Sequence, residues 1–111
     1  MPGAPSLIGS TIALDAKTGR ATQSARTVYV ALLSAAPNNA TTVATMSELV
    51  ATGYSRQAAT WSAPSGSPRT TSNTATITWG PFTSDPANVT HMALVSSASG
   101  LAGDFIWYWT A

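Results

Sequence analysis

The chain has 111 residues, a net charge of +1 and no cysteine. This length predicts a single domain, and the absence of cysteine excludes disulfides and thiolate metal sites. Its five basic residues are scattered along the sequence, which does not fit a nucleic-acid-binding patch.

Residues 1–10 contain two Pro and two Gly, and they predict an extended N-terminal arm. Leu7 and Ile8 are its apolar anchors, and we expect them to contact a neighbouring protein, because an ordered arm usually lies on something. The alternative is a frayed terminus. Thr11–Asp15 follows as a candidate short strand.

The densest β-forming run is Thr27–Leu33, where both alternating sets of side chains are apolar or aromatic. Such a strand is covered on both faces and belongs in the middle of a fold. Further along, Thr45 and Glu48 have the spacing of a capping box, which predicts one helical turn over Met46–Ala51. The alternating run Tyr54–Trp61 predicts another strand.

Thr74–Trp79 has the clearest amphipathic pattern, and it predicts a strand that places Trp79 in the core. Val89–Val95 is a second long β run. Asp104–Thr110 predicts a last strand with two alternating faces. Those faces are Phe105, Trp107 and Trp109 on one side and Ile106 and Tyr108 on the other.

Six or so short strands, separated by loops rich in Gly, Pro, Ser and Asn, predict an all-β fold. We expect one compact β-sandwich over residues 11–111, immunoglobulin-like or jelly-roll-like, preceded by the arm over residues 1–10. A small barrel is the alternative arrangement.

The residues that carry chemistry are few. His91 is the single histidine, and the four acidic residues lie in four separate segments, so neither a general base with its partner nor a metal site is indicated. Asp85 and Asp104 could form a carboxylate pair for glycoside hydrolysis. Both lie in turn-like contexts, however, where Asp is expected as an ordinary turn residue, and that interpretation is favoured. We therefore expect no enzyme activity, no cofactor and no metal.

Two broader features concern location and partners. No apolar run approaches the roughly 20 residues of a membrane span, and the N-terminus does not resemble a signal peptide. Charged residues form only 8% of the sequence, while 17 Thr and 14 Ser supply much of the polarity. Such a surface repels its neighbours weakly, which suits a protein that contacts other protein copies. An ordinary Ser/Thr-rich β-protein is the alternative.

Several segments together resemble a family of small bacteriophage virion proteins, often labelled tail-fibre proteins and in some phages placed on the head as decoration proteins. The resemblance covers roughly residues 27–109. It rests on the segments TVYVALLSAAP at 27–37, GYSRQA at 53–58, WSAPSG at 61–66, TSNTA at 71–75, ITWG at 77–80 and VTHMALV at 89–95.

This resemblance implies a compact β-sandwich-like module that acts by binding other virion proteins, without enzyme activity or a cofactor. Because the chain carries no repetitive shaft, we expect a head decoration protein that binds the major capsid protein, as a homo-oligomer and preferably a trimer. The alternative is a tail or tail-fibre module with a host-facing role. A carbohydrate-binding domain is the third reading, because Trp and Tyr stack on sugar rings.

Overall fold

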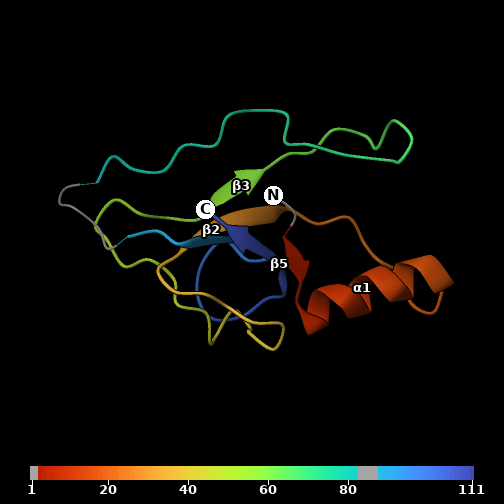
Figure 1. Cartoon of the computed structure of the whole chain (residues 1–111), viewed down its shortest axis with the longest axis horizontal. Helices are drawn as coiled ribbons and strands as arrows, with labels where there is room; N and C mark the ends of the chain where they lie inside the picture. Colours follow the sequence, from red (N-terminus) through yellow and green to blue (C-terminus); the bar gives the residue numbers. More distant parts are fainter. Residues whose placement is uncertain (1–2, 83–87) are drawn as a thin grey trace.

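The computed structural model describes residues 3–82 and 88–111. They form one antiparallel sheet of five strands in the order β1-β5-β4-β2-β3, with a single helix beside it (Figure 1). The elements, in chain order, are β1 (Ala4–Pro5), α1 (Leu7–Thr18), β2 (Val28–Leu33), β3 (Gln57–Ala59), β4 (His91–Val95) and β5 (Phe105–Thr110).

The structure confirms the strand-based, antiparallel character of the fold. The β-sandwich is not confirmed, because all five strands of the described residues belong to one sheet. The strand predicted over Thr27–Leu33 is confirmed as β2, which has β4 on one side and β3 on the other. Its residues from Val30 to Leu33 are buried, as expected for a strand covered on both faces.

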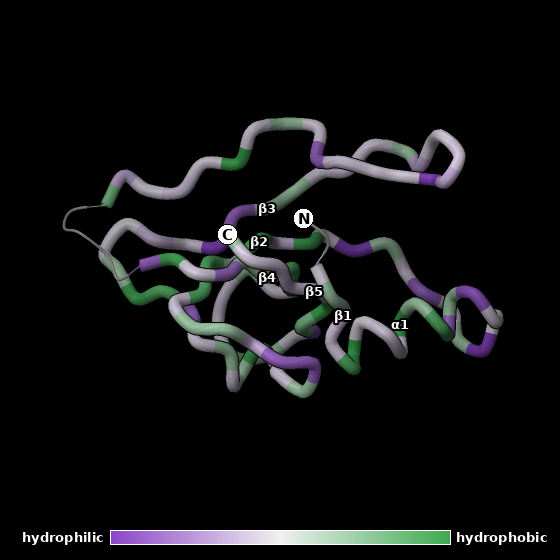
Figure 2. Tube along the Cα trace, viewed as in Figure 1, coloured by the Kyte–Doolittle hydropathy of each residue, from purple (hydrophilic) through white to green (hydrophobic). Residues whose placement is uncertain are grey.

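The main hydrophobic core lies on one face of the sheet. Its strand residues alternate along β2 and β4, and Val43 and Met46 reach it from the connection between β2 and β3. The buried members are Ala31, Leu33, Val43, Ala93, Val95 and Phe105. Figure 2 shows the hydrophobic stretches gathered in and around the sheet, whereas the excursion after β3 is mostly pale or purple.

A β-bulge divides β5 into two registers. Leu94 pairs with Trp107, but Val95 pairs with Phe105, so Ile106 is an extra residue on β5. The extra residue changes the alternation of faces. Phe105 therefore lies on the core side with Tyr108, their ring centroids 6.1 Å apart, and the predicted sharing of one face by Phe105 and the two following Trp residues is wrong.

The N-terminal segment differs from the predicted extended arm. Ala4–Pro5 pairs with β5, and a helix begins at Leu7, so the boundary expected at residue 10 lies inside α1. The cause is Ser6, whose side chain caps the helix by accepting a hydrogen bond from the Gly9 amide at 2.9 Å. The buried Ser6 hydroxyl also donates to the carbonyl of Phe105, which ties the helix start to the bulge.

Gly9 permits this close approach of α1 to β5. A Cβ at this position would overlap the carbonyl oxygen of Ile106. The strand expected over Thr11–Asp15 is accordingly helical. The helix ends at Thr18 and is capped by Gly19, which has a φ of 70°. Local capping at both ends of the segment therefore decides its structure.

Two further local predictions are wrong. Met46–Ala51 is not helical, because Glu48 forms a β-bridge with Leu33 instead of capping a turn. Thr74–Trp79 is not a strand of the sheet. It bends at Thr74 and Ala75 and has no regular secondary structure after them. Ile77 and Trp79 are half-buried over the sheet, whereas Ala75 is exposed.

An ion pair between a buried guanidinium and a partly buried carboxylate connects three parts of the chain. The Arg56 guanidinium binds the Glu48 carboxylate through Nε at 2.8 Å and Nη2 at 2.9 Å. Its remaining N–H groups donate to the carbonyl and hydroxyl of Ser97 and to the carbonyl of Gly100. The five donors of Arg56 are thus satisfied, although only 3% of its side chain is exposed.

Tyr54 completes this cluster. Its hydroxyl donates to Glu48 Oε2 at 2.5 Å and accepts a hydrogen bond from the Leu32 amide at 3.2 Å, within β2. Burial and the bond to the Glu48 carboxylate both raise the pKa of Tyr54. Burial alone raises the pKa of Glu48, but hydrogen bonds from Arg56 and Tyr54 outweigh it and hold that pKa below its ordinary value.

We expect Glu48→Ala to lower the free energy of unfolding by about 3–5 kcal/mol, because it leaves a buried guanidinium without its counter-charge. Chemical denaturation of the purified protein measures this loss. The matched control is Arg26→Ala, which breaks an ion pair with Asp104 whose side chains are 34% and 39% exposed. That change should cost no more than about 1 kcal/mol. Equal losses for the two variants would contradict the role of the cluster.

The same ion pair should make the fold sensitive to acid. Because the folded-state pKa of Glu48 is lowered, its contribution is present above the ordinary value of 4.5 and is lost as the pH falls through the folded-state pKa. In Glu48→Gln, this part of the decline in stability below about pH 4.5 should be missing. Denaturation curves at several pH values between about 3 and 7 compare the two proteins.

Candidate binding site on the tryptophan face

The second face of the sheet, opposite the main core, carries large apolar side chains. Val30 and Leu94 form a register pair on it, as do Leu32 and Met92. Because of the bulge, Trp107 stands opposite Leu94, and Trp109 stands opposite Met92, on this same face. We call this surface, made by Val30, Leu32, Met92, Leu94, Trp107 and Trp109, the tryptophan face.

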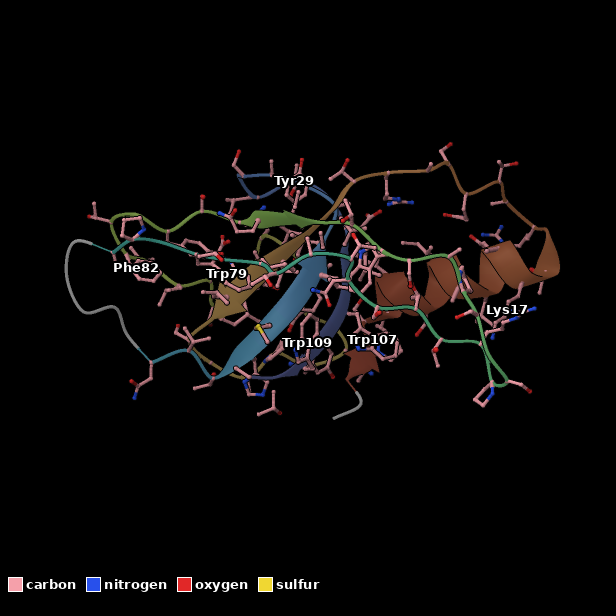
Figure 3. The ribbon with its side chains drawn as sticks, turned by 90° about the horizontal axis from the view of Figure 1, so that it is seen from above. Lys17, Tyr29, Trp79, Phe82, Trp107 and Trp109 are labelled. Atoms are coloured by element: carbon pink, nitrogen blue, oxygen red, sulfur yellow. The ribbon has the colours of Figure 1, made fainter. Side chains whose placement is uncertain are left out.

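A long excursion, residues 60–82, lies over the tryptophan face (Figure 3). Its first part doubles back on itself through the isolated bridges Trp61–Asn73 and Ser65–Thr70. The Thr74 amide donates to the Thr60 carbonyl at 2.9 Å, which closes the base of this hairpin-like turn beside the end of β3. The chain then crosses the sheet with Ile77 and Trp79 directed toward it.

The excursion covers the tryptophan face incompletely and leaves two hollows. The smaller, of about 400 Å³, lies between Ile77 and Trp79 above and Met92 and Trp109 below. The larger, of about 1000 Å³, is bounded by Trp107 and Trp109 on the sheet and by residues of the hairpin-like turn. Trp61 and Trp109 line both hollows, so all four Trp of the chain meet at this one place.

The polar groups at these hollows come from the excursion. Arg69, Thr70 and Thr71 line the larger hollow, and Asn73 and Thr76 line the smaller. This combination of aromatic walls with a few polar side chains is typical of small-ligand sites, and both volumes lie in the range of such sites. The arrangement offers flat apolar surfaces for stacking and hydrogen-bonding groups at their edge.

One polar atom in this region lacks a partner. The indole nitrogen of Trp79 is buried and, among the described residues, donates no hydrogen bond. A buried donor without an acceptor costs free energy. Trp79 is half-buried over the tryptophan face and does not belong to the main core, so its predicted place in the core is wrong.

The residues singled out in the sequence lie apart from this site. His91 begins β4, and its Nδ1 lies 3.0 Å from the Thr90 hydroxyl, while Asp104 pairs with Arg26. Asp85 lies outside the described residues. The side chain of Leu7 is 57% exposed on α1, and Ile8 is partly buried.

The described residues, 3–82 and 88–111, offer neither a metal-binding cluster nor a membrane-spanning helix. Within these ranges, no group of three or more His, Cys, Asp and Glu side chains is placed to hold a metal ion. None of the described helical structure is both long and apolar enough to cross a bilayer.

Sequence reasoning missed the tryptophan face as a unit. Trp and Tyr can stack on sugar rings, but the alternation rule places Phe105 on one face with Trp107 and Trp109. The signal that would have separated them is the bulge, and a bulge shows only when the strand is paired with its neighbour.

Comparison with known proteins places the chain beside a phage protein family. A family model described as "Podophage GP4 fiber I protein gp80" matches residues 10–111, which run from within α1 to the end of the chain. No curated protein and no solved structure matches the chain significantly.

The placement of the aromatic residues can be tested by truncation. Phe105 is fully buried in the main core, so Phe105→Ala should cost about 3–5 kcal/mol of stability. Trp61→Ala should cost no more than about 1 kcal/mol, because Trp61 is 40% exposed, and Trp79→Ala should fall between the two. Urea denaturation measures all three. A Trp79→Ala loss as large as that of Phe105→Ala would place Trp79 in the main core.

Proposed function

The chain belongs to the phage protein family described as Podophage GP4 fiber I protein gp80, and from this we propose that it is a structural subunit of a phage tail fibre. The observation that carries the proposal is the family match over residues 10–111. Membership makes the chain a phage structural protein. The name of the family favours the fibre over the capsid surface that the sequence had suggested.

The subunit would act by binding other virion proteins. Its most densely hydrogen-bonded cluster, at Arg56 and Glu48, is saturated within the chain and therefore serves the fold. Charged residues form 8% of the sequence, which keeps repulsion between neighbouring copies low. A head decoration protein remains the second candidate, because the same weakly charged, hydroxyl-rich surface suits contact with a capsid shell.

Helix α1 is the surface that we propose for association between copies. It extends away from the sheet, and Gly9 is its one buried residue (Figure 1). Leu7 and Leu14, about two turns apart, are 57% and 60% exposed. An isolated helix of this length is marginal in water, so packing against another chain would stabilise it.

An apolar groove runs along the inner side of α1 and supports this proposal. It encloses about 440 Å³ between Ile12 and Ala13 of the helix and Ile106 and Trp107 of β5. Leu14 also borders it, so a second copy that packs on α1 would cover the groove and the exposed leucine together. We propose a trimer as the assembled state.

The double variant Leu7→Lys with Leu14→Lys should dissociate the oligomer, because it places two charges on the proposed apolar contact. Light scattering coupled to gel filtration should give a multiple of 11.4 kDa for the wild type and the monomer mass for the variant. The control is Val50→Lys with Leu101→Lys, at positions 92% and 72% exposed, which should keep the wild-type mass. A monomeric wild type would contradict the proposal.

Placement on the virion needs a direct experiment. An epitope tag inserted after Leu101, in the exposed loop before β5, leaves the ends of the chain and the proposed α1 contact unchanged. Gold-labelled antibody should decorate the tail of intact particles in electron micrographs. Label distributed over the head would support the decoration protein and overturn the fibre proposal.

A further inference from the structure

We infer that the tryptophan face is a carbohydrate-binding site, with an oligosaccharide held between the sheet and the excursion over residues 60–82. This inference goes beyond the proposed structural role and does not depend on where the protein lies in the virion. It rests on the meeting of all four Trp at two adjoining hollows.

The first argument is the exposure of the indole rings. A Trp side chain buries a large apolar area when it can, so a protein with a small core is expected to enclose its Trp residues. Here Trp61 is 40% exposed, Trp107 and Trp109 are half-buried, and the main core uses Phe105 and aliphatic residues instead. The Trp rings are therefore available for contact with another molecule.

The second argument is the rigidity and spacing of the platform. Trp107 and Trp109 stand two residues apart on β5, so their side chains leave the same face of the sheet about 7 Å apart. Trp107 lies between Leu94 of β4 and Pro5 of β1, and Trp109 pairs with Met92 of β4. Successive sugar rings present apolar C–H faces that can stack on such neighbouring aromatic surfaces.

The third argument is the chemistry of the rim. Sugar hydroxyls both donate and accept hydrogen bonds, and the Thr70, Thr71 and Asn73 side chains do the same. These three side chains already donate within the excursion, to the carbonyls of Ser65, Ser62 and Ala75, so what they offer a ligand is mainly acceptor oxygens for sugar hydroxyls. A purely apolar occupant, such as an acyl chain, would leave these acceptors unused.

Arg69 indicates the kind of sugar. The ion pairs of the described residues use Arg20, Arg26 and Arg56, whereas Arg69 lines the larger hollow, exposed to solvent. A guanidinium binds a carboxylate through two parallel hydrogen bonds. An acidic sugar would therefore bind better than its neutral counterpart. A nucleic acid is disfavoured, because binding its phosphates takes several cations and this hollow offers one.

The test is an NMR titration of the full chain labelled with ¹⁵N, in which the four indole N–H signals are followed individually. The probes are a galacturonic-acid tetramer and a galactose tetramer, which differ in the carboxylate at C6, together with an array of neutral, N-acetylated and acidic glycans. We expect saccharide to shift the indole signals of Trp61, Trp107 and Trp109. The acidic tetramer should bind at least tenfold more tightly than the neutral one.

Three variants locate the site. Trp61→Ala should weaken binding at least tenfold, and Trp61 is chosen because its exposure makes a folded variant the expected result. Arg69→Ala should remove the preference for the acidic tetramer and leave neutral binding unchanged. Leu101→Ala, at an exposed position of the loop before β5, is the control and should bind as the wild type does.

Three results would overturn the inference. They are the absence of indole shifts with every glycan at millimolar concentration, binding that survives Trp61→Ala, and Trp61 and Trp109 indole signals that move with protein concentration instead of saccharide. Trp107 is left out of this last readout because it also lines the groove beside α1. The last would assign the tryptophan face to contact between copies. None of these results bears on where the protein lies in the virion, so the proposed function is judged separately.

Discussion

The ion pair between Arg56 and Glu48 is the interaction on which the covering of the main core depends. It joins the connection after β2, the start of β3 and the loop before β5, three segments with little regular structure of their own. A buried charge stabilises a fold only when its partners are complete. Here every donor of the guanidinium is used, and Tyr54 links the carboxylate to the backbone of β2. The cluster therefore holds the loops that cover the main core.

A single extra residue in β5 gives the molecule its two unlike faces. The bulge at Ile106 keeps Phe105 on the core side and sends Trp107 and Trp109 to the other side. The same region anchors the N-terminus, because the Ser6 amide donates to the Ile106 carbonyl at 3.2 Å. One backbone irregularity thus positions both the helix that we propose for association and the aromatic surface that we propose for ligand binding.

These two surfaces suit a subunit that works in many copies. The apolar contacts available on one α1 are few, and each contributes modestly, but an assembly multiplies them through effective concentration. Saccharide contacts at the tryptophan face would gain in the same way, since several weak sites on one fibre act together. A thin core is also less of a disadvantage in an assembly, because association stabilises the folded state by mass action.

The sequence alone determined the strand-rich class, the interior position of β2, the presence of β4 and β5, and the resemblance to phage virion proteins. The predicted strands depend on runs of β-forming residues, such as Thr27–Leu33, because the β-propensity of a few consecutive residues is enough to indicate a strand. Only the tertiary structure decided the rest. The attachment of Ser6 to β5, the bulge at Ile106 and the partner of Glu48 each depend on a group distant in sequence. These groups are the Phe105 carbonyl for the first, β4 for the second and Arg56 for the third. The site on the tryptophan face could not be predicted for the same reason, because alternation along a strand assigns faces correctly only while its pairing stays in register.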